Sequence, residues 1–536
     1  MLAFTSGHQS FRHNTSGLTL IHVPFSINAE RPLRSRPDDW GPFIFHAAWI
    51  LIALLTLFPY QILPAETMLN RREPFLQWFF EKYPGRGDIF ANMLLFAPFG
   101  FGLGWRLEKW KFPWPAALTL TCIASAAFSF CIELAQVFMP SRTSSWFDVL
   151  ANTAGGPLGW IVFRMAGERI RALLSSCLEF FDAIIRMFGA KLLVAFFVVF
   201  SLLAIAVSIT LVQWTMLNDW DVSFPLLVGN IPNGEYPWHG QLFEFAIADR
   251  AVKATEANRV FQDGLVSVAG SNIVASYRRA GPGDPSDESG HTPALHWTPQ
   301  GTTDTALKPG LLPGLGWMQS QGPAKVLESR IRDANQFSVY VFFAAIRPSS
   351  YGPGWIVALA PDAEQLDFAL GQHLSALVFR IRTRLTGVGG GQLEYHAHRF
   401  FQTPGPHRVL FTYDGATLRS YLDGKPGYAM ELGPGAVLFR HLGRLQQYET
   451  PGYKALYYGL FFVPLGSILA LAARITKRVP LAPLVCGLFL PGTLLEPILA
   501  TVSRRPIYPS NLLLAVGLTI AGFAFLRRYL PRATDA

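Results

Sequence analysis

The chain has 536 residues and a formal net charge of +9, yet only 15% of its residues are charged. Its mean hydropathy is +0.27. A soluble protein carries about 25% charged residues, so this composition excludes an ordinary soluble enzyme. Lys and Arg cluster beside apolar segments, which indicates membrane topology and argues against nucleic acid as a partner. The four cysteines lie in or next to these segments, so the polar middle of the chain folds without disulfides.

Eight segments are candidates for spanning helices, which need about 20 mostly apolar residues. Five precede the polar middle, at 43–63, 89–105, 115–139, 149–165 and 192–214, and three follow it, at 455–472, 481–502 and 507–525. Residues 1–42 contain no long apolar core and no small-residue cleavage site, so we predict a polar arm there and not a signal peptide. The predicted parts are this arm, a five-span bundle at 43–217, a polar domain at 218–450 and a three-span bundle at 451–536.

The distribution of Lys and Arg predicts the orientation of these spans. The connections that include residues 12–36, 106–111 and 164–191 carry more Lys and Arg than the alternate connections do. The positive-inside rule therefore places both termini in the cytoplasm and the polar domain outside. Residues 168–188 alternate apolar and charged faces at helical spacing, which predicts a helix on the cytoplasmic membrane surface. A packed linker helix is an equally good interpretation of that segment.

The most informative polar residues lie in and around the second, third and fourth apolar segments. They are Asp88, Asn92, Glu133, Gln136, Arg142, Asp148 and Asn152. Apart from the arginine they form three pairs, and the members of each pair share one face of a helix because they are three or four positions apart. A charge inside a bilayer costs roughly 2.5–3.5 kcal/mol on insertion scales, so these faces should turn inward. Arg142, in a short loop, is the natural partner for Glu133 and Asp148.

Two interpretations of this polar set compete. In one, the polar groups only hold three helices together. In the other, they form a pocket at the outer interface that binds a charged or hydroxylated head group. We favour the pocket, because so many polar groups on three helices exceed what packing of a bundle needs.

The same stretch contains an ordered set of motifs: Asn92, Phe96-x-Pro98-x-Gly100, Glu133-x-x-Gln136, Arg142, Asp148 and Asn152-x-x-Gly155. This set resembles the VanZ-like family of membrane proteins, over residues 88–165. The resemblance implies a cell-envelope role in the inner membrane of a bacterium, with the polar domain in the periplasm. It implies no mechanism, because no reaction is established for that family.

The last three apolar segments repeat part of this pattern. The retained positions are Glu496, Arg505 and Asn511, whose counterparts are Glu133, Arg142 and Asp148. The glutamate precedes the arginine by nine residues in both sets, whereas the positions of the two amides Gln136 and Asn152 hold Leu499 and Ala515. We predict a degenerate second copy with a mainly structural role. Chance matching over so few positions is the alternative.

The polar middle is predicted to be an all-β jelly-roll sandwich. Its strand-like runs include Phe337–Phe343, Trp355–Leu359 and Ala376–Arg382, and Asp-Gly turns separate others. The run Thr412-Tyr-Asp-Gly415 with Tyr421-Leu-Asp-Gly424 resembles the concanavalin-A and laminin-G-like lectins. Motifs that resemble the closing strands of those lectins come first here, which requires a permuted sandwich. The resemblance implies carbohydrate binding.

The polar domain offers little that points to catalysis. It contains no Glu-x-Asp-x-Glu arrangement of the kind that glucanases use. His396 and His398 share one strand face, but no third ligand accompanies them, so we predict neither a metal nor a cofactor. A binding module for glycan or protein is favoured over a hydrolase.

The sequence predicts a multi-domain membrane protein with about eight α-helical spans and a β-sandwich. The favoured function is non-enzymatic: the sandwich binds an envelope polysaccharide or polymer, and the membrane pocket binds a membrane lipid or glycolipid. The first alternative is an enzyme acting on a lipid-phosphate carrier, with Glu133 or Asp148 as base and Arg142 holding the anion. A transporter is the third possibility.

Overall fold

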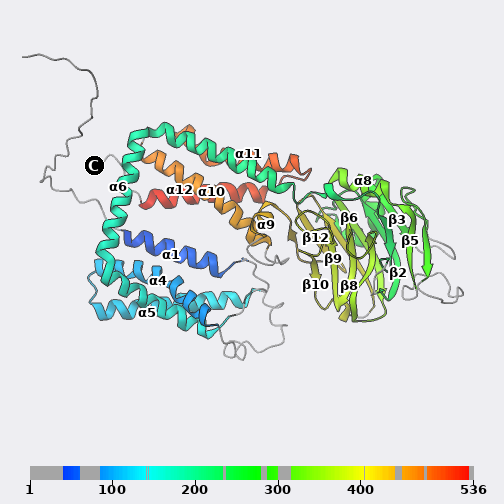
Figure 1. Ribbon diagram of the computed structural model, residues 1–536, viewed down its shortest axis with the longest axis horizontal. Coiled ribbons are helices and arrows are strands. Elements are labelled where there is room, and N and C mark those ends of the chain that lie inside the picture. The colour runs from blue at the N-terminus through cyan, green and yellow to red at the C-terminus, as the bar shows by residue number, and fades with distance from the viewer. Residues whose placement is uncertain are drawn as a thin grey trace, which may run out of the picture.

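The computed structural model describes residues 40–58, 60, 85–139, 142, 144–232, 237–278, 286–299, 316–403, 405–440, 450–475 and 480–529. The predicted polar arm at 1–42 lies almost entirely outside these residues. The helices occupy one end of the molecule and the β domain the other (Figure 1). The chain enters the β domain from helix α6 and leaves it into helix α10. The β domain is therefore inserted between two groups of helices.

The first helical unit consists of α1 (Trp40–Thr56), α4 (Arg86–Lys109), α5 (Trp114–Val137) and the first part of α6 (Trp146–Val212). Glycines let α4 and α6 approach closely: a Cβ atom added to Gly100 would lie 1.9 Å from Gly156 O, and one added to Gly159 would lie 1.8 Å from Ala97 O. Small residues at helix contacts are typical of membrane bundles, where close backbone packing replaces the hydrophobic effect.

Helix α6 links the two helical units. It is broken at Gly189, whose φ of 71° is non-helical. Before this break α6 runs across the ends of the other helices, and after it the chain turns back toward the β domain (Figure 1). The crossing part includes the segment predicted as an interfacial helix, and it exposes Leu173, Phe180 and Met187. Its contact with a membrane surface stays a prediction.

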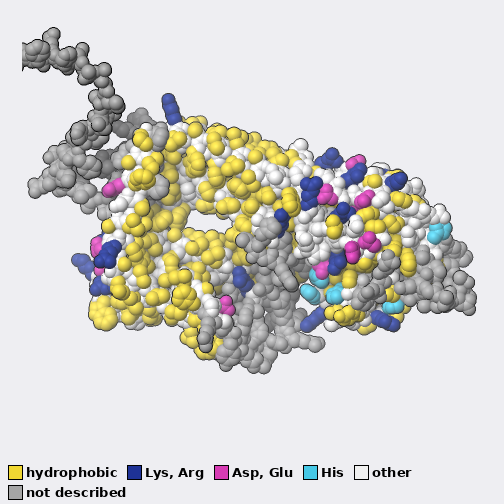
Figure 2. All heavy atoms as spheres, viewed as in Figure 1, with side chains coloured by type: hydrophobic (Ala, Val, Ile, Leu, Met, Phe, Trp, Pro, Cys, Tyr) yellow, Lys and Arg dark blue, Asp and Glu magenta, His cyan; other side chains and the backbone are white. Residues whose placement is uncertain are grey.

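The second helical unit consists of the last part of α6, α10 (Thr450–Ile475), α11 (Leu481–Val502) and α12 (Pro509–Tyr529). Among the described residues, six helical segments are long and apolar enough to cross a membrane: Gly87–Lys109, Trp114–Val137, Lys191–Asp219, Thr450–Arg474, Leu481–Val502 and Pro509–Tyr529. Hydrophobic side chains cover the visible face of the helices, whereas charged side chains gather over the β domain and at the far end of the helices (Figure 2).

The predicted number of eight spans is not confirmed. The first predicted span corresponds to α1, which is a shorter apolar helix of 17 residues. The span predicted at 149–165 is helical as part of α6, but it is not among the six segments. Asp148, Asn152 and several glycines lower the hydropathy there. The structure therefore consists of a helical membrane part that is joined to a β domain.

The β domain has two antiparallel sheets. The first has the strand order β10 (Tyr395–Ala397), β9 (Ala376–Ile381), β8 (Phe368–Leu374), β7 (Ser350–Leu359), β1 (Pro225–Val228), β5 (Gly316–Pro323) and β4 (Leu295–Pro299). The second has the order β13 (Lys425–Pro426), β12 (Thr417–Leu422), β11 (Pro406–Tyr413), β6 (Phe337–Ala345), β2 (Gly240–Ala248) and β3 (Ile273–Arg278), and β14 (Met430–Glu431) pairs with β12. The short helices are α7 (Ala257–Ala269), α8 (Lys325–Ala334) and α9 (Pro434–Phe439).

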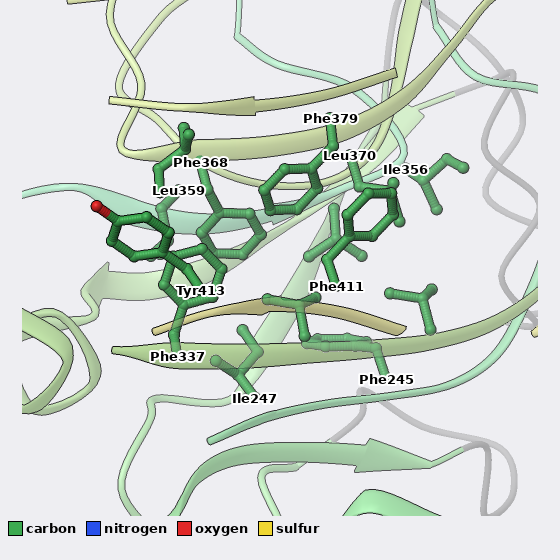
Figure 3. Close-up of a cluster of buried hydrophobic side chains, with 14 of the residues drawn as sticks. Phe245, Ile247, Phe337, Ile356, Leu359, Phe368, Leu370, Phe379, Phe411 and Tyr413 are labelled. Atoms are coloured by element: carbon green, nitrogen blue, oxygen red, sulfur yellow. The ribbon is translucent and has the colours of Figure 1, made fainter. Parts of the chain in front are cut away.

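An aromatic core lies between the two sheets. Phe379 from the first sheet stacks on Phe411 from the second, with ring centroids 4.4 Å apart, and Phe337 and Phe368 lie beside them (Figure 3). Alternate residues of each strand point into this core, as the period of two in a strand requires. The predicted strands at Phe337–Phe343, Trp355–Leu359 and Ala376–Arg382 fall in β6, β7 and β9. The jelly-roll topology and the likeness to lectins stay predictions.

The β domain contains two buried acids, Asp367 and Glu328, and their raised pKa values determine how we expect the stability of the domain to depend on pH. Burial raises the pKa of Asp367 to about 8, although its carboxylate accepts the Asp221 N–H at 2.9 Å. Burial, followed by the nearby Asp367, raises the pKa of Glu328 to about 10. Both acids therefore hold a proton in the folded chain that they release on unfolding at neutral pH.

We expect the stability that these protons contribute to be complete below about pH 4 and to be lost as the pH rises, up to about pH 8 for Asp367 and about pH 10 for Glu328. The slope is up to about 1.4 kcal/mol per pH unit for each proton. The double variant Asp367→Asn with Glu328→Gln should flatten this dependence. Thermal unfolding of the full chain, followed by near-ultraviolet circular dichroism from pH 4 to 8, measures it. Asp263→Asn on the exposed face of α7 is the control, and an equal slope in both variants would contradict the assignment.

Candidate functional site

The predicted polar residues lie at the end of the first helical unit that is nearer the β domain, which we call the sandwich end. They belong to the start of α4, the end of α5 and the start of α6, except Arg142, which lies in the loop between α5 and α6. These three helix ends lie on the side of the β domain (Figure 1). The basic residues Arg106 and Lys109, in contrast, occupy the last turn of α4 at the far end. The polar set is therefore separated from the basic end by the length of the helices.

Glu133 connects α5 to the loop that precedes α6. Its side chain is buried, with 3% of the residue exposed. Glu133 Oε2 accepts the Ser145 N–H at 2.8 Å, and its backbone oxygen accepts the Ser144 hydroxyl at 2.8 Å. Glu133 thus fixes the α5–α6 loop at the sandwich end.

Two asparagines link the three helices. Asn92 Nδ2 on α4 donates to Asp148 Oδ1 on α6 at 2.8 Å. Asn152 Nδ2, one turn further along α6, donates to Ser129 Oγ on α5 at 2.9 Å. These bonds link α4 to α6 through Asn92 and Asp148, and α5 to α6 through Ser129 and Asn152.

Arg142 and Gln136 bind the end of α1. Arg142 Nε donates to Phe58 O at 2.6 Å and Nη2 to Leu55 O at 3.3 Å, while Gln136 Nε2 donates to Thr56 O at 2.8 Å. The last carbonyl groups of a helix have no partner inside the helix, so such donors satisfy them. This role could not be predicted from the sequence, because every residue has a backbone carbonyl and the sequence does not show which of them a side chain will bind. The pairing of Arg142 with Glu133 and Asp148 stays a prediction.

Asp88 stabilises the first turn of its own helix, α4. It is exposed, and its Oδ2 accepts the Gly85 N–H at 3.1 Å in the first turn of α4. A carboxylate is stabilised at this position by the free N–H groups and the dipole of the helix. Asp88 therefore lies at the edge of the polar set.

The second unit contains a compact polar cluster at the same end. Arg505 donates from its two terminal guanidinium nitrogens to Glu496, at 2.5 and 3.0 Å, and Asn511 Nδ2 donates to Glu496 at 3.1 Å. The Tyr508 N–H also donates to Glu496, at 2.9 Å. Tyr508 follows Glu496 by twelve residues, as Ser145 follows Glu133. The two glutamates thus accept equivalent backbone N–H groups.

Close helix contacts also correspond between the two units. A Cβ atom on Gly466 would lie 2.0 Å from Thr519 O, and one on Gly522 would lie 2.4 Å from Val463 O. These contacts occupy the positions of the Gly100 and Gly159 contacts in the first unit. Where Asn152 meets Ser129 in the first unit, Ala515 packs against Gly492 in the second. The matched contacts support a duplication, which we keep as a proposal.

The second cluster joins the membrane part to the β domain. Asn335 Nδ2, after α8, donates to Ser503 O in the α11–α12 loop at 2.6 Å, and Gln336 Nε2 donates to Arg504 O at 2.6 Å. Gly415, in the β11–β12 turn, has a φ of +92°, and a Cβ atom there would lie 2.8 Å from Ser503 O. Apart from the glycine of the turn, no pattern in the sequence indicates this joint.

Among the described residues, no group of three or more His, Cys, Asp and Glu side chains is arranged to hold a metal ion. His396 Nε2 and Glu394 Oε1 lie 2.7 Å apart, and the His396 and His398 rings stack with centroids 5.7 Å apart. Burial raises the pKa of Glu394, but the bond to His396 and the charge of Arg380 outweigh burial and lower it to about 2. Glu394 is therefore a charged partner in a surface pair.

Comparison with known proteins shows a family similarity for the first helical unit. Residues 39–167 match the VanZ/LLP1 family model. The matched region contains α1, α4, α5 and the start of α6, and with them all seven polar residues of the first set. The first helical unit is therefore similar to the VanZ/LLP1 family. The comparisons found no matching curated protein and no matching solved structure.

Proposed function

We propose that the chain is a multi-pass cell-envelope protein whose VanZ-like unit binds the head group of a membrane lipid or glycolipid. In this proposal it lies in a bacterial inner membrane with both termini in the cytoplasm and the β domain in the periplasm. The basic residues at the far ends of α4 and α12 support this orientation, since positive residues favour the cytoplasmic side. The binding is non-enzymatic.

One observation supports head-group binding most directly. Asn152 Oδ1 and Ser125 Oγ are buried and have no hydrogen-bond partner among the described residues. A buried polar atom without a partner costs about 1–3 kcal/mol, so such atoms normally meet a ligand or a water molecule. A hydroxylated head group could donate to Asn152 Oδ1 while Ser129 accepts from the other atom of the same amide.

The test compares polar residues of the two units. We expect Asn152→Ala and Asp148→Asn to reduce the lipid that remains bound to the purified chain in native mass spectrometry, with protein yield unchanged. Thr519→Ala, in the second unit, is the control and should keep the lipid, because the buried Thr519 hydroxyl already donates to Ala515 O. Loss of folded protein in both first-unit variants would show that the polar set only holds helices together.

We further propose that the β domain binds a glycan or envelope polymer. Its place outside the membrane and the likeness of its turns to lectins support this role. Binding of the full chain to isolated cell-wall polysaccharide, measured with and without competing free sugar, tests it. Binding that free sugar does not reduce would contradict a glycan ligand and favour a protein partner.

A further inference from the structure

The two helical units touch through aromatic side chains at both ends of their shared boundary. At the end far from the β domain, the ring of Phe43 on α1 lies 5.5 Å from Phe525 and 5.5 Å from Tyr529 on α12. At the sandwich end, the ring of Phe58 lies 5.0 Å from Tyr453 on α10. Figure 2 shows an opening between the units, with hydrophobic side chains along both of its rims.

The residues that face this opening follow from helical spacing. Leu54 comes eleven residues after Phe43, which is three turns of a helix, and Leu460 comes two turns after Tyr453. Both leucines therefore lie on the faces that make the aromatic contacts, and they are 46% and 51% exposed. Further residues on the same faces of α1 and α10 are apolar as well: Ile50 on α1 and Leu456 on α10.

Water is not expected to fill an opening that is lined by apolar side chains. Water enters an internal space only where polar groups can bind it, and apolar spaces stay dry. An empty space would leave the leucines without contacts on one side. The α10 and α12 helices next to it are apolar enough to cross a membrane, so the surrounding medium is lipid hydrocarbon.

The sandwich end of the opening adjoins the first polar set. Phe58, whose ring lies 5.0 Å from that of Tyr453, also supplies the carbonyl that Arg142 binds at 2.6 Å. A hydrocarbon chain that lies between Leu54 and Leu460 would therefore place an attached head group near Arg142, at the end of the helices where the polar residues gather.

We propose that the opening between the two helical units holds the hydrocarbon chain of a membrane lipid whose head group lies at the first polar set. This inference rests on the proposed function and adds the site of the apolar part of the ligand. The VanZ-like unit alone would then lack part of the site, since one wall comes from α10 and α12.

The experiment uses the full chain in nanodiscs that contain phosphatidylglycerol with a photoactivatable diazirine in its acyl chain. After irradiation, peptide mass spectrometry locates the labelled residues. We expect labelling of α1 and α10 at the opening, and loss of this labelling when Leu54→Trp and Leu460→Trp together fill the space. Leu202→Trp, on an exposed part of α6, is the control and should leave the labelling unchanged.

The outcomes separate the two proposals. Labelling at the opening that persists in the filled variant, or that is no stronger than at Leu202, overturns the hydrocarbon site. Labelling that disappears in the filled variant but is unaffected by Asn152→Ala supports the hydrocarbon site while removing the link to the polar set. A thermal unfolding curve that matches the unmodified chain shows that the filled variant is folded, and a variant that unfolds early is replaced by Leu54→Phe with the same readout.

Discussion

Replacing Glu496 with alanine is expected to lower the free energy of unfolding by about 3–5 kcal/mol, because it leaves the buried Arg505 charge without its partner. The side chains of the pair are only 2–4% exposed. Glu496 also accepts hydrogen bonds from Tyr508 and Asn511, so its loss frees the α11–α12 loop that binds the β domain. Denaturant unfolding in detergent and limited proteolysis of the junction measure both effects.

A matched surface pair provides the control for this prediction. Glu108 and Arg164 form an ion pair at 3.4 Å with side chains about half exposed. Glu108→Ala should cost no more than about 1 kcal/mol, since solvent already screens an exposed pair. Equal effects of Glu108→Ala and Glu496→Ala would contradict the assignment of the second cluster as the joint.

Replacing Gly159 with alanine is the second change with a large expected effect. The added Cβ atom would lie 1.8 Å from Ala97 O and 2.8 Å from Phe101 N, both backbone atoms of α4. Neither can rotate away as a side chain can, so α4 and α6 must separate. Overpacking of this kind costs about 1–3 kcal/mol or more. We expect a lower melting temperature and a smaller folded fraction on size-exclusion chromatography.

Gly459 on α10 is the matched control for the glycine substitution. A Cβ atom added there meets nothing within 4 Å. Gly459→Ala should leave stability unchanged or raise it by about 0.5–1 kcal/mol, because alanine is a better helix former than glycine. A stable Gly159→Ala variant would mean that α4 and α6 are further apart than described.

The joint also gives the second unit a role that differs from that of the first. Both units place a buried glutamate and a following loop at the sandwich end. In the second unit that loop is occupied by Asn335, Gln336 and the Gly415 turn of the β domain. The positions that correspond to the amides Gln136 and Asn152 hold Leu499 and Ala515 in the second unit, whose loop anchors the β domain.

The sequence alone determined the parts whose rules are local. Apolar stretches identify membrane helices, because backbone groups in lipid must be satisfied within the helix itself. The alternation at Phe337–Phe343 identified a strand for a similar reason, since successive side chains point to opposite faces. The spacing of Asp148 and Asn152 predicted that they share one face of a helix, and in the structure both bond to neighbouring helices, Asp148 to Asn92 and Asn152 to Ser129.

Only the tertiary structure decided how these parts meet. Arg142 binds carbonyls of α1 more than eighty positions away in the chain, and the α11–α12 loop meets Asn335, which lies in another domain. The bend of α6 at Gly189 sets the two units side by side and leaves the opening between them. Such features depend on backbone atoms and on contacts between distant segments. Neither of these has a period or a spacing that can be read along a single chain.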